Sequence, residues 1–391
     1  MDLRKYSANL NPLFLNNQSK NMKISPSKMA SPWITQHEKN LVAEMMDSGW
    51  DNYKYVEDFE PKFAKWHDRK YALMTPCCTH ALHLLLLALD IKDGDEVIAP
   101  ECTWTGSIAP IIYQRAKPVF CDINPNTWCL DIDSVKERIN EKTKAIILVD
   151  LYGNMAEMEE FEKLAAQNDL FLIEDAAEAL GSIYKDKRAG KFGIGGVHSF
   201  HRTKTMTTGE GGALLIDDDE VYERAKFLRD HGRSSENPYY VLEAAPKYMP
   251  SNYQASLALG QFERINELVD KKRHILHLYK EYLLKKDGLQ LNLENENLYN
   301  GVWAPSLVFD NAYNLKNKEI ISELSNKGVP SRPFFYPMSS IPAYKNYETG
   351  SRDLNPNAYS ISERGITLPS AYNLRDSEIK YIAESIISLL K

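Results

Sequence analysis

A lysine stands among hydroxyl side chains in the segment from Val197 to Leu215. Lys204 is flanked there by Thr203 and Thr205, and three glycines follow before an apolar run. A lysine amine attacks a carbonyl carbon when it is deprotonated, and desolvation or neighbouring positive charge favours that state. The segment therefore offers an amine that could form an imine. Taken alone, it also fits a surface lysine in a glycine loop.

An acidic pair closes an apolar run upstream of that lysine. Glu174 and Asp175 follow the run at 170–173, and the small residues of 176–181 come next. Small residues permit a flat ligand to approach the carboxylates closely. An isolated acid at a strand end is also commonly a helix N-cap or a solvated side chain. The motif indicates a ligand only in combination with others.

Two further loops carry a hydroxyl and an aromatic ring. Thr79, in Thr75–Leu82, stands where a helix is expected to begin, and a helix start is an anion site suited to a phosphate. Trp104, in Pro100–Thr105, could stack on a planar ring. A plain N-cap and a core tryptophan are the alternative interpretations. The glycines of 192–196 lack the dinucleotide spacing and a strand before them, so they are weak evidence of NAD binding.

The elements that position these motifs alternate between short apolar runs and helical segments. We expect strands at 71–75, 96–99, 118–122, 145–149 and 170–173, and helices at 34–48, 56–67, 79–89, 105–113 and 158–167. Continuous apolar strands separated by helices predict an α/β fold with a mainly parallel sheet covered on both faces. Ligands of such sheets bind beyond the carboxyl ends of the strands. The candidate motifs are expected to meet there.

The rest of the chain predicts a second, smaller unit. A long amphipathic helix is expected from about 252 to 282, followed by a strand at 303–308 and helices at 318–326 and 377–390. We therefore expect three parts: an extension at 1–30 that is flexible or forms an arm, a large domain at 31–265, and a small C-terminal α/β domain at 266–391.

Composition narrows the class of protein. The 391 residues are 43% hydrophobic and 26% charged, which is ordinary globular usage, and the net charge of -7 opposes non-specific binding to nucleic acid or anionic lipid. The longest apolar run, 82–89, is far shorter than the ~20 residues of a membrane helix. We expect neither a nucleic-acid nor a membrane partner, and the N-terminus lacks the pattern of an export signal.

Cysteines and histidines do not suggest a metal. The five cysteines show no CxxC spacing, so neither a zinc site nor a disulfide framework is expected, and a reducing cytoplasm is the simplest location. They are Cys77, Cys78, Cys102, Cys121 and Cys129. Four histidines are interpreted as ordinary surface or helix residues: His67, His83, His231 and His274.

Taken together, the four loops resemble a pyridoxal phosphate (PLP) site. From about residue 30 to the end, the sequence also resembles the DegT-type sugar-nucleotide aminotransferases, within the aspartate aminotransferase fold. The resemblance rests on ALHLLLLALDIKDGDEVIAP with TW after it, AKPVFCDINPNTWCLD, IEDAAEALGS, SFHRTKTMTTGEGGALL, SNYQASLALGQFERI, SRPFFYP and ERGITLPS. It implies fold type I of the PLP-dependent transferases: a large domain with a mainly parallel seven-stranded sheet and a smaller C-terminal α/β domain.

The resemblance also implies roles for individual residues. Lys204 would be the Schiff-base lysine, which moves protons once substrate releases it, and Asp175 would hold the protonated pyridine nitrogen. Further cofactor contacts would come from Trp104 on the ring, Glu178 near the ring hydroxyl, Thr79, the His80 amide and Ser199 at the phosphate, and Lys247 at the phosphate of a neighbouring subunit. A homodimer with shared active sites follows from the last of these. Cys78 stands where the family usually has Gly, and its side chain is expected to restrict how closely that backbone approaches the phosphate.

Within that family, three motifs look most similar to enzymes that aminate C4 of a 4-keto-6-deoxy sugar nucleotide, as in perosamine and viosamine formation for surface polysaccharide. They are SFHxxKTMTTGEGG, EDAAEALG and SRPFFYPMSSIPAY. We expect L-glutamate as the amino donor, with His201, Arg332 and Tyr336 near the sugar or diphosphate. The alternatives are a 3-aminotransferase, an aminotransferase of a cyclic ketone, a PLP-dependent sugar dehydratase and a non-catalytic relative. The dehydratases carry histidine in place of the lysine, so Lys204 argues against that alternative.

Overall fold

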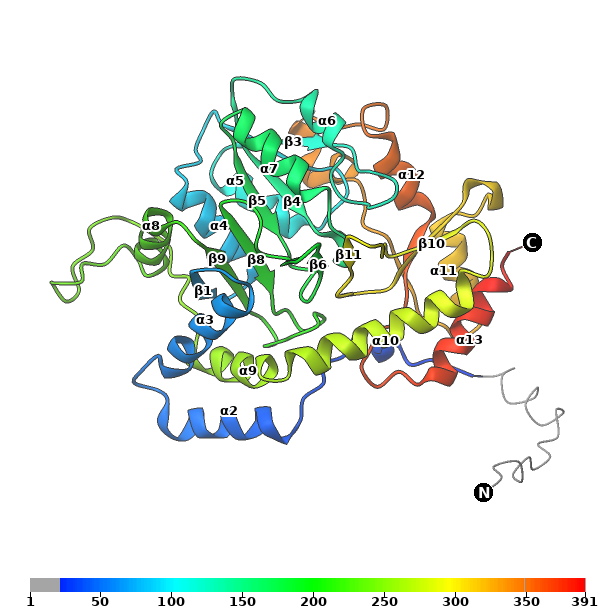
Figure 1. Ribbon diagram of the computed structural model, residues 1–391, viewed down its shortest axis with the longest axis horizontal. Coiled ribbons are helices and arrows are strands. Elements are labelled where there is room, and N and C mark those ends of the chain that lie inside the picture. The colour runs from blue at the N-terminus through cyan, green and yellow to red at the C-terminus, as the bar shows by residue number, and fades with distance from the viewer. Residues whose placement is uncertain (1–21, 348, 391) are drawn as a thin grey trace.

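A seven-stranded sheet forms the centre of the computed structural model, which describes residues 22–347 and 349–390 (Figure 1). Its strand order is β1-β9-β8-β5-β4-β2-β3. The strands are β1 (Tyr71–Thr75), β2 (Glu96–Pro100), β3 (Lys117–Cys121), β4 (Thr143–Val149), β5 (Phe171–Asp175), β8 (Gly195–Ser199) and β9 (Gly212–Ile216). Strand β9 runs antiparallel to both of its neighbours, and β8, β5, β4, β2 and β3 are parallel. The mainly parallel seven-stranded sheet is thus confirmed.

The sheet is buried on both faces, which explains its continuous apolar strands. In β1, Leu73 packs into one core cluster, whereas Ala72 and Met74 pack into another on the opposite face. Helix α4 (Cys78–Ala88) covers the first face, and helices α3 (Lys54–Trp66) and α9 (Asn252–Phe262) cover the second. Further helices around the sheet are α2 (Gln36–Ser48), α5 (Ala109–Tyr113), α6 (Ile132–Lys136), α7 (Met158–Gln167) and α8 (Asp219–Arg229).

Two predicted helices are divided in the structure. The segment predicted at 105–113 is a short 3-10 turn, Thr105–Ser107, followed by α5. The long helix predicted at 252–282 is two helices, α9 and α10 (Ile265–Leu283). Arg264 leaves the helical conformation at the junction, with φ of -113° and ψ of 17°. Figure 1 shows α10 running from the large sheet to the C-terminal part of the chain, so this helix connects the two.

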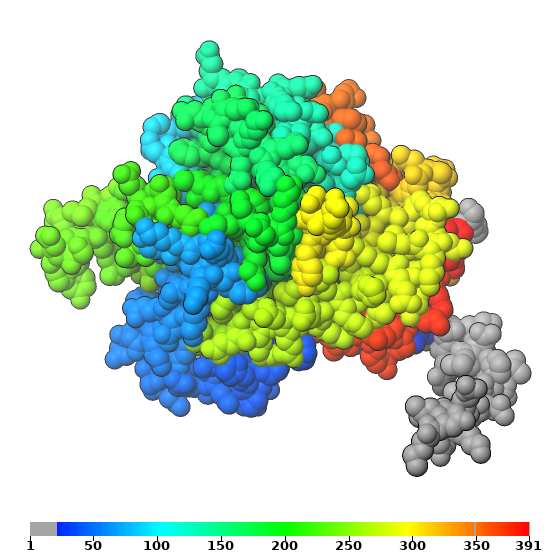
Figure 2. Space-filling model, viewed as in Figure 1, coloured from blue at the N-terminus to red at the C-terminus, as the bar shows by residue number. Residues whose placement is uncertain are grey.

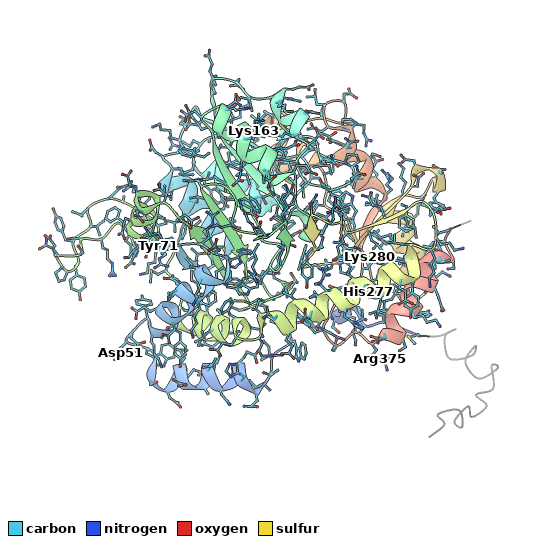
Figure 3. The ribbon with its side chains drawn as sticks, in the orientation of Figure 1. Asp51, Tyr71, Lys163, His277, Lys280 and Arg375 are labelled. Atoms are coloured by element: carbon cyan, nitrogen blue, oxygen red, sulfur yellow. The ribbon has the colours of Figure 1, made fainter. Side chains whose placement is uncertain are left out.

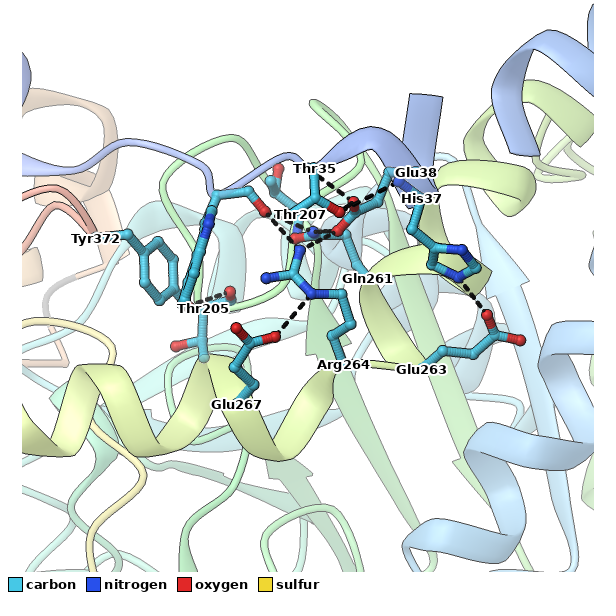
Figure 4. A network of polar contacts seen from close by, with 11 residues as sticks. Thr35, His37, Glu38, Thr205, Thr207, Gln261, Glu263, Arg264, Glu267 and Tyr372 are labelled. Carbon is cyan, nitrogen blue, oxygen red and sulfur yellow. Dashed lines mark hydrogen bonds and ion pairs between the residues drawn. The ribbon is translucent and has the colours of Figure 1, made fainter. Parts of the chain in front are cut away.

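A buried polar network holds this junction (Figure 4). The Arg264 guanidinium donates to Glu38 Oε1 at 2.7 Å, and Gln261 Nε2 donates to the same oxygen at 2.6 Å. Glu38 also accepts from the backbone N–H of Thr35 in a capping box that begins α2. Burial raises the pKa of Glu38, but hydrogen bonds from Thr35, from the Glu38 backbone and from Gln261 outweigh it and lower the pKa to about 2. Glu38 therefore stays ionised at neutral pH.

Replacing Glu38 is expected to destabilise the protein. Glu38→Ala leaves Arg264 and Gln261 without their shared acceptor, so the free energy of unfolding falls by about 3 kcal/mol in denaturant titrations at pH 7. Because the folded pKa lies below the unfolded value of about 4.3, the ionised group stabilises the fold above that value and the effect is lost as the pH falls toward about 2. The control is Glu44→Ala on the exposed side of α2, with an expected change within about 0.5 kcal/mol. Equal losses in both variants would contradict the network's role.

The C-terminal part of the chain has its own sheet and core. Its four antiparallel strands lie in the order β10 (Leu289–Leu291), β12 (Ser306–Phe309), β14 (Gly365–Thr367) and β13 (Arg332–Pro333). Helices α11 (Asn317–Asn326), α12 (Pro356–Arg364) and α13 (Asp376–Ile387) belong to this part, and α10 packs on α13. A small third sheet, β11 (Leu298–Tyr299), β6 (Ile183–Tyr184) and β7 (Lys187–Arg188), was not predicted. The boundary near residue 265 stays a prediction.

Residues 22–30 pack against this C-terminal part. Ile24 lies in its core and donates a backbone hydrogen bond to Gly328 at 2.8 Å. Ser370 donates its backbone N–H to the carbonyl oxygen of Lys28 at 3.1 Å, within the 3-10 turn Pro26–Met29. The predicted lead-in is therefore docked over this stretch, and residues 1–21 lie outside the described residues.

An arm formed by residues 231–247 projects from the body beyond α8 (Figures 1 and 2). The arm carries four exposed apolar or aromatic side chains, Tyr239, Tyr240, Val241 and Leu242. Figure 3 labels polar and charged side chains elsewhere on the molecule, among them Lys163 of α7, His277 of α10 and Arg375 before α13. Within the described residues, no helix is both long and apolar enough to cross a membrane.

Candidate active site

A cavity of about 370 Å³ lies at the carboxyl ends of the parallel strands. It is lined by the loops that follow β1, β2, β5 and β8 and by residues of the C-terminal part. The predicted site residues that line it are Thr79, Trp104, Asp175, Glu178, Ser199, His201, Lys204 and Arg332. The structure therefore brings together motifs that are separated by more than 250 positions in the sequence.

Asp175 ends β5 and is only 3% exposed. Its Oδ2 accepts from Ser107 Oγ at 2.7 Å, and its Oδ1 accepts from the backbone N–H of Ala177 at 3.1 Å. Burial raises the pKa of Asp175, whereas these two hydrogen bonds and the charge of Lys204 oppose that rise. The carboxylate is fixed in orientation and suited to hold a cationic ring nitrogen. The sequence analysis missed Ser107, although it stands three positions after Trp104.

Lys204 forms an ion pair with Glu178 inside the cavity. The Lys204 Nζ lies 3.1 Å from Glu178 Oε1, and Glu178 Oε2 accepts from the backbone N–H of Tyr152 at 3.0 Å. Burial raises the pKa of Glu178, and the positive charge of Lys204 opposes this effect. The two carboxylates are thus held differently, Asp175 by neutral donors and Glu178 by the lysine itself.

The loop that carries Lys204 is fixed at both ends by backbone hydrogen bonds. The N–H of Lys204 donates to His201 O at 2.8 Å, and the N–H of Thr208 donates to Phe200 O at 2.9 Å. Tyr372 OH donates to Thr205 O at 2.6 Å, a contact drawn in Figure 4. These contacts fix the backbone from which the Lys204 side chain extends into the cavity.

Glycines explain how the lysine loop meets the start of α4. A Cβ on Gly212 would lie 2.4 Å from the backbone nitrogen of Cys78, so only glycine permits this approach of β9. Cys77, Cys78 and Thr79 line the cavity at this helix start, where backbone N–H groups favour an anion. Burial raises the pKa of the Cys78 thiol well above its usual value, so the thiol stays neutral and does not repel a phosphate.

The glycines of 192–196 have a different explanation. Gly195 and Gly196 belong to β8, and a Cβ on Gly196 would lie 2.5 Å from Gly190 O. They serve the packing of a strand. The weak interpretation as a dinucleotide loop is therefore replaced by a structural one.

Glu101 connects the loop of Trp104 to the segment that contains Arg332. Its Oε1 accepts from the backbone N–H and from the Oγ of Ser339, both at 2.7 Å, and its Oε2 accepts from Asn355 Nδ2 at 2.5 Å. Glu101 is fully buried. This carboxylate therefore joins the loop after β2 to the segments that contain Ser339 and Asn355.

Three predicted residues lie outside the cavity lining. The His80 N–H donates to Cys77 O at 3.1 Å and its ring stacks on Tyr248, with 4.1 Å between ring centroids. Lys247 pairs with Asp230 at the base of the arm, and Tyr336 is half exposed. Their proposed contacts stay predictions. Arg202 and Trp303, which the sequence analysis did not single out, line the cavity instead.

The donor set of the cavity fits PLP. A buried carboxylate, an amine and a helix start match the ring nitrogen, the carbonyl and the phosphate of that cofactor. In the described ranges 22–347 and 349–390, no group of three or more His, Cys, Asp or Glu side chains is arranged to hold a metal ion. All five cysteines are free.

Comparison with known proteins agrees with this chemistry. A GDP-perosamine synthase of Escherichia coli O157:H7 is 36% identical over 358 residues, 91% of this chain and 96% of that protein. The PLP form of a putative sugar aminotransferase, Spr1654 from Streptococcus pneumoniae, superposes with a TM-score of 0.87 at 27% identity, over 94% of this chain and 98% of that one. An E. coli GDP-4-keto-6-deoxy-D-mannose-3-dehydratase with hydrated PLP has a TM-score of 0.85 at 24% identity, over 95% and 100%, and shares the fold.

The fold and the cavity define a PLP-dependent transaminase. Residues 32–387 match the model of the DegT/DnrJ/EryC1/StrS aminotransferase family, and the chain belongs to that family. The resemblance found in the sequence is thereby confirmed, as are the fold type and the cofactor.

Proposed function

We propose that this transaminase transfers an amino group from L-glutamate to C4 of a 4-keto-6-deoxy sugar nucleotide, forming a perosamine-type amino sugar for surface polysaccharide. The observation that carries the proposal is the Lys204 amine, 3.1 Å from Glu178 in a cavity that also holds Asp175. The similarity to a GDP-perosamine synthase over 91% of the chain supports the substrate class. The five cysteines are free, which is consistent with a location in the reducing cytoplasm.

Different residues of the cavity have different roles in amino transfer. PLP, when bound, supplies a reactive carbonyl and a ring that accepts electrons. The Asp175 carboxylate stabilises positive charge at the ring nitrogen. Lys204 Nζ takes up and returns the proton that moves during amino transfer, and Glu178 keeps this amine oriented. Thr79, Ser199 and the start of α4 bind the phosphate, and Trp104 packs on the ring.

The sugar nucleotide is proposed to bind near His201, Arg332 and Tyr336. His201 and Arg332 line the cavity, and Tyr336 lies on the same segment as Arg332. Guanidinium groups bind phosphate oxygens well, so Arg332 suits the diphosphate of a sugar nucleotide. Lys204 disfavours the dehydratase alternative, because that class carries histidine at this position.

The proposal is tested by product analysis. The purified protein is incubated with PLP, L-glutamate and, separately, GDP-, dTDP- and UDP-linked 4-keto-6-deoxy sugars, and the products are resolved by mass spectrometry and NMR. An amine at C4 of at least one sugar supports the proposal. Amination at C3 alone, or loss of a hydroxyl without amination, would replace it with one of the alternatives.

We also propose a homodimer in which Lys247 reaches the phosphate site of the partner. Two observations support it: Lys247 lies outside the cavity of its own chain, and the arm beside it carries exposed apolar side chains. Lys247→Ala is expected to weaken PLP binding about tenfold, by the loss of one charged phosphate contact.

Complementation distinguishes a shared site from a local one. Lys204→Ala and Lys247→Ala subunits, both impaired alone, are unfolded together and refolded as a mixture. Half of the dimers are then mixed, and each mixed dimer has one intact site if Lys247 acts across the interface, so about a quarter of wild-type activity returns. Activity that never exceeds that of Lys247→Ala alone, or a monomer by sedimentation, would contradict the shared site.

A further inference from the structure

The amine of Lys204 is covered by a tryptophan from the C-terminal part of the chain. Lys204 Nζ lies 3.7 Å from the centroid of the Trp303 ring, and its other neighbour is Glu178 at 3.1 Å. An ammonium over an indole face is attracted by the electron-rich ring. The amine is thus held between an aromatic face and a carboxylate. The lysine and the tryptophan are 99 positions apart.

Several contacts fix the indole ring in this place. Trp303 Nε1 donates to Thr203 O at 2.8 Å, the residue before Lys204. The ring stacks on Tyr152 with 5.8 Å between centroids and an interplanar angle of 9°. Lys272, which is buried, donates to Trp303 O at 3.4 Å. The ring and its backbone are therefore both restrained.

The backbone before Trp303 adopts a conformation that its sequence disfavours. Val302 has φ of +53°, and β-branched residues rarely enter the left-handed region. Its N–H donates to Asn300 Oδ1 at 2.9 Å, which holds the turn. Strain of this kind persists where the surrounding structure imposes it, and it is concentrated at functional sites. Here the strained residue directly precedes Trp303, whose ring faces the lysine.

We propose that Trp303 is a positioning residue that keeps the amine of Lys204 beside the cofactor whenever this amine is not bonded to it. A lysine has four rotatable side-chain bonds, so a released amine without this wall would sample solvent and other orientations. Held between the ring and Glu178, the amine stays ready to move the proton. The inference rests on the role of Lys204 proposed above.

The test compares Trp303→Leu, which removes the aromatic face, with Trp303→Phe, which retains a face but loses the N–H. The first readout is the rate at which acetic anhydride acetylates Lys204 in the cofactor-free full chain, mapped by peptide mass spectrometry. The second is the rate at which L-glutamate removes the cofactor absorbance at about 420 nm. This half-reaction does not depend on the identity of the sugar, so a wrong sugar assignment leaves the test intact.

In Trp303→Leu, acetic anhydride is expected to acetylate Lys204 about tenfold faster than in the wild type. The maximal rate with L-glutamate should fall about tenfold, and the half-saturating L-glutamate concentration should stay within about twofold of the wild-type value. In Trp303→Phe, which retains an aromatic face, both rates should stay close to the wild-type values. Trp66→Leu is the control, because Trp66 also faces a cation, with the Arg188 guanidinium 4.5 Å from its ring centroid, but lies outside the cavity lining. Equal acetylation in Trp303→Leu and wild type, or the same change in Trp66→Leu, overturns the proposal. If Trp303→Leu does not fold, Trp303→Met takes its place.

Discussion

Lys204→Ala is expected to abolish transamination, lowering kcat/KM by at least about 10⁴-fold, because it removes the amine that we propose as both the attachment point of the cofactor and the proton carrier. Alanine leaves Glu178 buried without its ion-pair partner, at 6% exposure, so PLP binding weakens as well. The measurement is steady-state kinetics with L-glutamate and the sugar nucleotide found active. The absorbance at about 420 nm should disappear in the same variant.

The matched control for this prediction is Lys163→Ala. Lys163 is an exposed lysine on α7, labelled in Figure 3, and its removal should leave kcat/KM unchanged within error. If Lys204→Ala retained more than about a hundredth of wild-type activity, the proton would have to be moved by another group. The role assigned to Lys204 would then be wrong.

Asp175→Asn is expected to lower kcat by about 10²- to 10³-fold, the usual effect of removing a pre-organised electrostatic partner. The asparagine keeps the shape of the side chain and can still accept from Ser107, whose Oγ lies 2.7 Å from the carboxylate. What it loses is the negative charge that we propose stabilises a protonated ring nitrogen. Single-turnover measurements with L-glutamate isolate this step from product release.

Ser107→Ala provides the graded comparison for Asp175. It removes one of the two hydrogen bonds that orient the carboxylate but leaves the charge, so kcat should fall by about tenfold. A decrease in Ser107→Ala as large as that in Asp175→Asn would show that orientation matters more than charge. Unchanged kcat in Asp175→Asn would remove this residue from the catalytic machinery.

The sequence predicted the parts of the site that follow the strands of the sheet. Asp175, Lys204 and Thr79 each stand just after an apolar run, and parallel topology brings such positions to one edge. The eight predicted residues that line the cavity come from local motifs of this kind or from the family pattern. Periodicity and turn chemistry are local signals, so this part of the site could be predicted from the sequence.

Features that depend on distant contacts were not predicted. Trp303 reaches the lysine only because the C-terminal part packs beside the sheet. No local sequence pattern at 300–304 predicts this contact. The break at Arg264 carries neither Gly nor Pro, and Arg264 there binds Glu38, more than 200 positions upstream. Short strands such as β6 and β11 are only two residues long, so their periodicity is not detectable.

The central claim is that the amine of Lys204 carries the cofactor. Reduction of the purified holoenzyme with borohydride, followed by proteolysis and peptide mass spectrometry, locates the residue bonded to PLP. The account predicts a phosphopyridoxyl group on Lys204, and none on the exposed Lys187 or on Lys247. A label on another lysine, or no label on a protein that is otherwise active, would contradict it.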